Sequence, residues 1–313
     1  MAQGFGHGSD SSIATAGTIA CWHDSASGAS GASGSGQRRL GAMSESLPPS
    51  AYTAVGANVY RASALTRGPW HPQHQHAGPP IALVCRAIES AALEHGLSHV
   101  SRLTANSLRP VPIGELAIEV ANGYVGRNAG HFSAEVLAGD KCVARFTALL
   151  QRENAVRLPD DLPGHPLPGA RLGPDQAPPA EFPFAGRHVG YSDLVETRIA
   201  SGVMFSGPSA VWFRMRHPLL EGEAPSVYQR VAVAADSGNG ISAILDFANY
   251  VFVNSDLSIH LLRRPRGDWI CVDARTHLGP HGCGLAESKL FDADGLIGVA
   301  AQSLSIRARH DRN

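Results

Sequence analysis

Residues 105–152 read ANSLRPVPIGELAIEVANGYVGRNAGHFSAEVLAGDKCVARFTALLQR, and residues 257–307 read LSIHLLRRPRGDWICVDARTHLGPHGCGLAESKLFDADGLIGVAAQSLSIR. The two stretches align with little drift, since Glu115 precedes Asp268 by 153 residues and the arginines that end them are 155 residues apart. This period is far longer than the roughly 20 to 50 residues of solenoid repeats, so it indicates duplication of a whole module. We therefore predict two copies of one α+β module in a single chain.

The composition narrows the class of protein. The chain has 313 residues, of which 43% are hydrophobic, and this is enough apolar material for substantial cores. Lys and Arg number 26 against 27 Asp and Glu, so the chain lacks the basic excess typical of nucleic-acid-binding proteins. Five scattered cysteines without a CxxC pair favour reduced thiols in the cytoplasm. Apolar runs fall short of the roughly 18 residues of a membrane span, so we expect none.

The first 50 residues are predicted to be a disordered tail. The part up to Ala42, which includes SASGASGASGSGQRR, is rich in Gly and Ser and cannot bury enough apolar surface to offset the entropy of ordering. A continuous apolar segment followed by a small-residue cleavage site is missing, which disfavours a secretory signal. Translation could start at Met1 or at Met43.

The first module is expected over residues 51–152. The segment AGPPIALVCRAIESAALEHG carries apolar residues at three-to-four spacing, which predicts a helix over about residues 79–95 with prolines in its first turn. Segments of β-type composition with Gly-bearing turns between them predict strands at 115–121, 131–137 and 143–151.

A Pro/Gly-rich linker, residues 153–190, separates this module from the second, residues 191–313. There VWFRMR alternates as a two-faced strand, and Ser226 opens a helix that ends near Asp236. Further strands are expected near 247–253, 258–262, 269–275, 284–291 and 299–306. An antiparallel sheet wrapped around one helix is a hotdog module, so the predicted fold class is α+β, a double hotdog with sheets joined edge to edge.

With this predicted fold, the chain resembles the acyl-CoA thioesterase superfamily of double-hotdog type, which includes the bacterial type II acyl-CoA thioesterases. The resemblance covers about residues 58–307, and it is carried by HAGPP, VWFRMR, AAD, NSDLSIHLLRR and AAQSL. It implies an acyl-CoA thioesterase that hydrolyses an acyl-CoA thioester to free acid and CoA with neither a metal nor an organic cofactor.

The resemblance also implies a site. Family members activate water with an Asp, a Thr and a Gln, which fall on Asp236, Asn254 and Gln302, with Ser255 as the alternative if the register slips by one. Asn in place of Thr is a departure, because an amide can orient water but cannot relay a proton as a hydroxyl can. A carboxylate in an apolar groove can serve as general base toward water. Backbone N–H groups near a helix N-terminus are expected to stabilise the oxyanion.

Other residues were weighed as site components. His76 and Gly78 are expected to line the substrate entrance through the helix that follows them. The cluster of His71, His74 and His76 has no acidic or Cys partner in its loop, so a metal site is not predicted. The SGNG sequence at 237–240 lacks the Lys of a phosphate loop and predicts a turn.

The repeat predicts a single catalytic centre. When the two copies are aligned segment by segment, Asp236 falls opposite Ala91 and Gln302 opposite Thr147. The first copy therefore lacks the carboxylate. One centre near the junction of the modules follows, with the first module supplying walls.

Two other functions stay open. The chain could be a catalytically weak or inactive acyl-CoA or lipid-binding protein, a reading that the Asn254 departure favours. Hydration of enoyl-CoA is disfavoured because no Asp/His pair stands in the expected helix setting. The chain is also a candidate to form a homo-oligomer.

Overall fold

The computed structural model describes residues 46–168 and 171–309. Most of the predicted tail, with both candidate start methionines, lies outside these residues. No helix in the described ranges is both long and apolar enough to cross a membrane.

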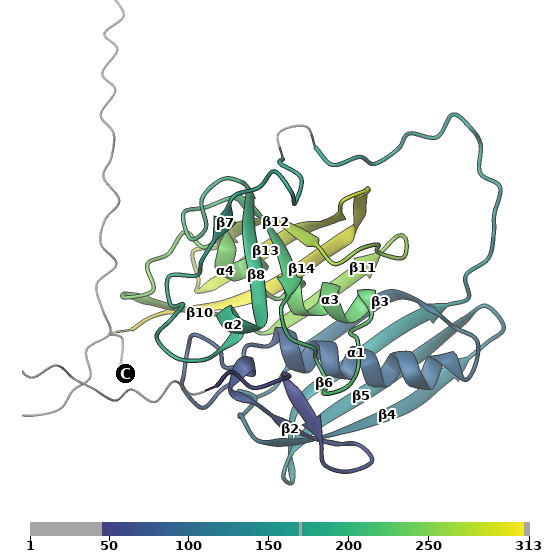
Figure 1. The fold of residues 1–313 in the computed structure, drawn as a ribbon, viewed down its shortest axis with the longest axis horizontal. Coiled ribbons are helices and arrows are strands. Elements are labelled where there is room, and N and C mark those ends of the chain that lie inside the picture. The colour runs from purple at the N-terminus through teal and green to yellow at the C-terminus, as the bar shows by residue number, and fades with distance from the viewer. Residues whose placement is uncertain (1–45, 169–170, 310–313) are drawn as a thin grey trace, which may run out of the picture. The chain divides into compact units, whose positions relative to one another are not determined.

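The first module is a helix with a sheet wrapped around it (Figure 1). In chain order its elements are β1 (Tyr52–Ala54), β2 (Val59–Ala62), η1 (Ala64–Thr66), α1 (Gly78–Leu93), β3 (His99–Ser107), β4 (Glu115–Val125), β5 (Ala129–Ala138) and β6 (Lys141–Gln151).

The second module has the same plan with two short helices added. Its elements, with the short strand that precedes it, are β7 (Pro179–Ala180), α2 (Tyr191–Leu194), β8 (Val195–Ser201), β9 (Ser209–Met215), α3 (Val227–Ala235), α4 (Gly238–Ile241), β10 (Tyr250–Asn254), β11 (Asp256–Leu261), β12 (Ile270–Leu278), β13 (Cys283–Asp292) and β14 (Gly295–Ala308). The predicted turn at 237–240 was wrong, because Gly238–Ile241 forms α4.

The strand order reads almost the same from either end. It runs β1-β2-β4-β5-β6-β3 and then β11-β14-β13-β12-β9-β8-β7, with β10 also paired to β14. Each strand of the first module thus has a counterpart at the mirrored place in the second, which adds β7 and β10, and the repeat axis passes between β3 and β11. This arrangement confirms the double hotdog.

The modules meet along the antiparallel pair β3 and β11, as the edge-to-edge prediction required. At this junction Leu103 lies opposite Ile259, and both side chains are buried. The hydroxyls of Thr104 and Ser258, also opposite each other, are 2.9 Å apart. Pairing β3 with β11 satisfies backbone groups that would be exposed at the edge of either half alone.

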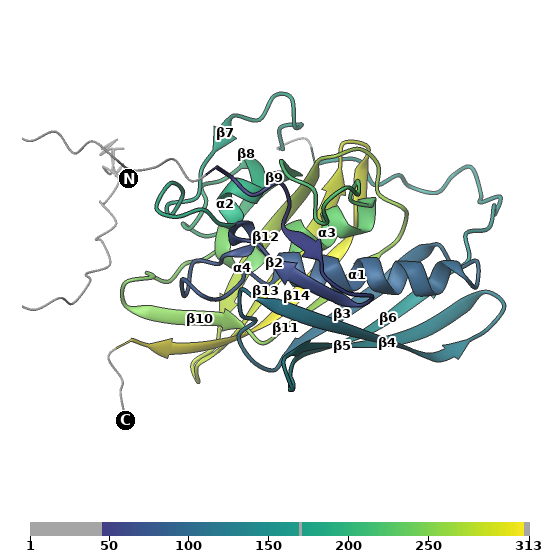
Figure 2. The ribbon, with the colours of Figure 1, turned by 60° about the horizontal axis from the view of Figure 1, so that its bottom comes forward.

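Helices α1 and α3 pack against each other on the inner side of the sheet (Figure 2). They are antiparallel, since Gly78 at the start of α1 lies against Val233 near the end of α3, and Glu89 lies against Ser226 before the start of α3. A Cβ at Gly78 would stand 2.6 Å from the Val233 carbonyl oxygen. Only a glycine allows this close approach of the two backbones.

Part of the predicted linker packs on the second module. The Leu172 carbonyl accepts a 2.8 Å bond from the indole N–H of Trp212, and the His165 carbonyl accepts one of 2.8 Å from the Leu296 amide. These contacts bury the outer face of β9, including Trp212, which would otherwise be solvated.

Candidate active site

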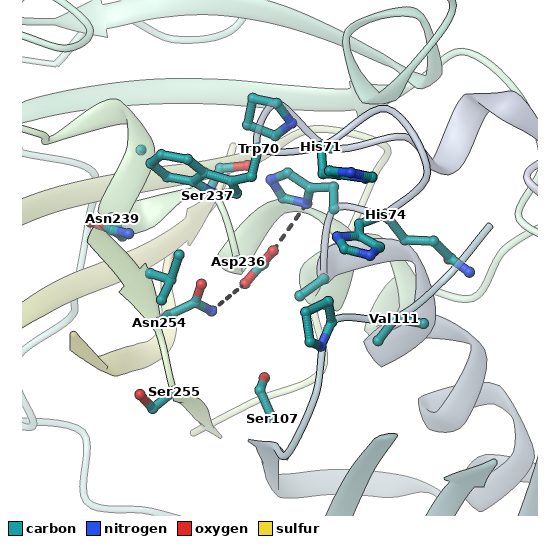
Figure 3. A pocket seen from close by; sticks show the side chains of 18 of the residues that line it. Trp70, His71, His74, Ser107, Val111, Asp236, Ser237, Asn239, Asn254 and Ser255 are labelled. Atoms are coloured by element: carbon teal, nitrogen blue, oxygen red, sulfur yellow. Dashed lines mark hydrogen bonds and ion pairs between the residues drawn. The ribbon is translucent and has the colours of Figure 1, made fainter. Parts of the chain in front are cut away.

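Asp236 lies at the end of α3, where its carboxylate meets groups from both modules. Its Oδ2 is 3.0 Å from His76 Nδ1, and its Oδ1 accepts a 2.8 Å bond from Asn254 Nδ2. Figure 3 marks both contacts with dashed lines. His76 comes from the loop before α1 and Asn254 from the end of β10, so the two helix ends and a strand converge here.

Gln302 points inward from β14 and is almost fully buried. Its Nε2 donates to the Asp236 backbone carbonyl at 3.1 Å and lies 3.4 Å from Oδ1 of the same residue. Its Oε1 accepts a 2.9 Å bond from the Asn239 amide. The structure therefore brings together Asp236, Asn254 and Gln302, the three residues that the resemblance selected, and adds His76.

The surroundings of Asp236 keep its carboxyl ionised. Burial alone raises the pKa of this group, but the contact with His76, with further bonds from Asn254 and the Gly78 amide, outweighs burial and places the pKa below its ordinary value. An ionised carboxylate has no proton to donate, so Asn254 must turn its NH₂ toward Asp236. Its carbonyl oxygen is then free to face the pocket.

The same argument fixes the tautomer of His76. Its Nδ1 lies near both the Asp236 carboxylate and the Gly78 amide, at 3.0 and 3.2 Å, and it cannot donate to one while accepting from the other. Because the carboxylate only accepts, Nδ1 carries the proton. The imidazole also stacks on the ring of Tyr191, with centroids 3.7 Å apart and planes inclined by 2°. Tyr191 is anchored in turn by a 2.8 Å bond from its hydroxyl to the Val233 carbonyl.

A pocket of about 340 Å³ opens over this cluster. Segments of both modules line it, including the loop of residues 68–77, residues 107–111, and residues 253–255. Five of the lining residues carry aromatic rings, and we call them the aromatic wall: Trp70, Phe182, Phe184, Phe205 and Phe247. Ring contacts of 5.1 to 6.3 Å connect them in series. The pocket thus joins a polar cluster to an apolar lining, as small-molecule sites commonly do.

Sequence reasoning missed the aromatic wall. Phe182 and Phe184 belong to the predicted linker, residues 153–190, whose sequence contains no other Phe, Trp or Tyr. That pair of aromatic residues in a Pro-rich segment was the available signal.

Two predicted site residues have other positions. Ser255 lies in the break between β10 and β11, is exposed at the pocket, and points away from Asp236 in Figure 3. Gly78 does not line the pocket; its role is the close crossing of α1 and α3, and its amide faces the Asp236 and His76 pair. With Pro79 and Pro80 next in the first turn of α1, this helix N-terminus has few N–H groups to offer an oxyanion.

The predicted repeat counterparts were wrong in two places. Glu89 lies against the first turn of α3, where its Oε2 accepts bonds from Ser226 Oγ at 2.8 Å and Gln229 Nε2 at 3.2 Å. This mirrors the place of Asp236 against α1, so the first copy does contain a carboxylate, although Glu89 does not line the pocket. Thr147 is exposed whereas Gln302 is buried, so the two residues are not counterparts. An offset error of one residue explains the wrong pairing, because it moves a strand position to the other face of the sheet.

The His71 and His74 rings stack on each other at 4.3 Å in the pocket lining, on the same loop as His76. Burial and the nearby His71 lower the pKa of His74, which favours its neutral form.

Comparison with protein-family models identifies both halves of the chain. Residues 66–151 match the acyl-CoA thioesterase N-terminal domain, and residues 168–306 match the acyl-CoA thioesterase C-terminal domain. The chain belongs to the acyl-CoA thioesterase family. Among curated proteins, no sequence matches it significantly.

Several solved structures share this fold. A provisionally named thioesterase from Novosphingobium aromaticivorans has 20% identity and a TM-score of 0.61, over 82% of this chain and 98% of its own. A provisionally named thioesterase II from Thermobifida fusca has 16% identity and a TM-score of 0.64, over 83% and 96%. The acyl-CoA thioesterase II TesB2 of Mycobacterium marinum has 16% identity and a TM-score of 0.54, over 84% and 96%. At these identities the likeness concerns the fold.

Proposed function

We propose that the protein hydrolyses acyl-CoA thioesters to free acid and CoA by attack of a water molecule assisted by Asp236. The observation that carries the proposal is the convergence of Asp236, Asn254 and Gln302 on one point beside an aromatic-walled pocket. The family of both halves supports a thioester substrate.

Each polar residue has a distinct part in this proposal. Asp236 supplies the negative charge that drives the loss of a proton from water. Gln302 donates to the backbone carbonyl of Asp236 as well as to its side chain, so it holds the end of α3 in place. Asn254 donates to Asp236 and presents its own oxygen as an acceptor for water. An amide can thus fill the position that the family gives to Thr.

The test is release of free CoA from a panel of acyl-CoAs, measured for the wild type and for Asp236→Asn. We expect the variant to lose about a hundredfold or more in kcat, because the amide cannot support proton removal, while acyl-CoA binding persists. Glu89→Gln is the matched control, since it makes the same change at the mirrored carboxylate away from the pocket and should keep the rate. An Asp236→Asn enzyme that hydrolyses at the wild-type rate would refute the mechanism.

Two alternatives give different results in that assay. A binding protein without activity would bind acyl-CoA and release no CoA from any member of the panel. Hydration of enoyl-CoA returns as a candidate because the structure pairs Asp236 with His76, the Asp/His pair that the sequence did not reveal. It would consume the enoyl chromophore without releasing CoA.

A further inference from the structure

The Asp236 carboxylate has little capacity left to accept a proton. Both of its oxygens already accept hydrogen bonds, Oδ2 from His76 and Oδ1 from Asn254, with Gln302 Nε2 near Oδ1 as well. Its side chain is only 4% exposed. A carboxylate held this way is well suited to orient a neighbour, and it is a weak base toward water.

His76 has the open position that Asp236 lacks. Its Nδ1 carries a proton toward Asp236, so Nε2 holds the free lone pair. Within residues 46–168 and 171–309 no hydrogen-bond partner contacts Nε2. The side chain lines the pocket and is 14% exposed, and stacking on Tyr191 fixes the plane of the ring. Asp236 from α3 and the Tyr191 phenol from α2 are the titratable groups packed directly on this imidazole.

We infer that His76 is the residue that removes the proton from the attacking water, and that Asp236 orients and stabilises it. This inference rests on the proposed thioester hydrolysis and assigns its proton transfer to a different residue. One of the dashed lines from Asp236 in Figure 3 marks the contact of its carboxylate with this imidazole. The arrangement follows the logic of other catalytic pairs, in which a buried carboxylate holds an imidazole in the required tautomer.

The steps balance without any other reactant. As a water lone pair forms the bond to the thioester carbon, the carbonyl π pair moves to oxygen and one water proton passes to His76 Nε2. The imidazolium is stabilised by Asp236 through Nδ1–H. When the carbonyl re-forms, the C–S bond breaks, and the sulfur takes the proton from Nε2 to leave as the CoA thiol. His76 returns to its starting tautomer, and the other product is the free acid.

The test compares His76→Asn with the wild type in CoA release. The Asn amide N–H stands close to the place of imidazole Nδ1–H, so the variant keeps a donor for Asp236 and lacks the Nε2 base. We expect kcat to fall on the order of a hundredfold with little change in melting temperature. The acid limb of the wild-type kcat/KM profile against pH should be absent from the residual activity of the variant. His99→Asn is the control, because His99 contacts Tyr228 and does not line the pocket.

The outcomes separate this inference from the proposed function. If the wild type releases no CoA from any acyl-CoA, thioester hydrolysis itself is wrong. If the wild type is active and His76→Asn keeps its rate within about threefold, with the same acid limb, His76 serves only to hold Asp236 and the inference is overturned. Imidazole added to His76→Gly gives a second measurement. Restored turnover supports a base at this position, and failure of rescue with a folded variant counts against it.

Discussion

Phe205 combines a strained backbone with a place in the pocket. Among the residues that the structure describes, Phe205 is the one residue other than glycine with a positive φ, which is 61°. It lies in the turn between β8 and β9. Such a conformation costs about 1 to 3 kcal/mol for a residue with a side chain. The turn is held by a 2.9 Å bond from the Phe205 amide to the Ile241 carbonyl, and the ring joins the aromatic wall. The strained turn thus places the Phe205 ring in the pocket lining.

We therefore predict that Phe205→Gly changes acyl selectivity more than stability. Glycine relieves the strained φ, which offsets part of the packing lost with the ring. The ratio of kcat/KM for a bulky over a short acyl group should rise at least about tenfold, measured by CoA release. Val203→Ala, at an exposed position in the same turn, is the control and should leave this ratio unchanged. An unaltered ratio in Phe205→Gly would show that the ring does not limit the acyl group.

At the scale of elements, the crossing of α1 and α3 positions the site. Gly78 lets the two backbones approach, and residues on either side of that contact are His76 and Asp236. Gly78→Ala should force the helices apart and cost about 1 to 3 kcal/mol, as overpacking does. The melting temperature should fall, and CoA release with it, because the 3.0 Å contact between His76 and Asp236 must lengthen. Gly114→Ala, where a Cβ meets nothing within 4 Å, should change neither. Equal melting temperatures for the wild type and Gly78→Ala would contradict this account.

Periodicity found the elements whose alternation is regular. The helices α1 and α3 and the strands β4 to β6 and β12 to β14 were all predicted from sequence, because each buries one face over several turns or residues. Strand β3 was not predicted, since its register to β6 shifts between Val100 and Arg102 and the bulge breaks the alternation. A local pattern cannot show that this irregular strand forms the junction of the modules.

The site was predictable only in part for a similar reason. Asp236, Asn254 and Gln302 could be selected by resemblance, and the structure brings them together. The contact of His76 with Asp236 joins residues 160 positions apart and depends on two antiparallel helices from different modules. No pattern along the chain specifies that crossing. The repeat counterparts failed at Thr147 and Ala91 because offsets drift, and a strand face changes with every residue.

For the whole molecule, the mirrored strand order means that neither module is complete alone. Each module contributes one strand to the β3 and β11 junction and one helix to the packed pair of α1 and α3. The backbone amides of Ala51 and Tyr52 also donate to the Pro218 and Leu219 carbonyls, which links the modules a second time. Separating the halves would expose the facing sides of both helices and an unpaired edge. We therefore expect residues 46–309 to unfold as one cooperative unit.

Ile259→Ala tests this coupling, because Ile259 is buried on β11 opposite Leu103 of β3. Removing its buried methyl and methylene groups should cost about 2 to 5 kcal/mol. If the two modules unfold together, native-state hydrogen exchange should show the same loss of protection for slow amides in β5 of the first module and in β13 of the second. Calorimetry should show a single transition in both proteins, with equal calorimetric and van't Hoff enthalpies. A loss of protection confined to β13, or two separate transitions, would show that the modules are independent domains sharing an edge. The site between them would then have to assemble from two separately folded parts.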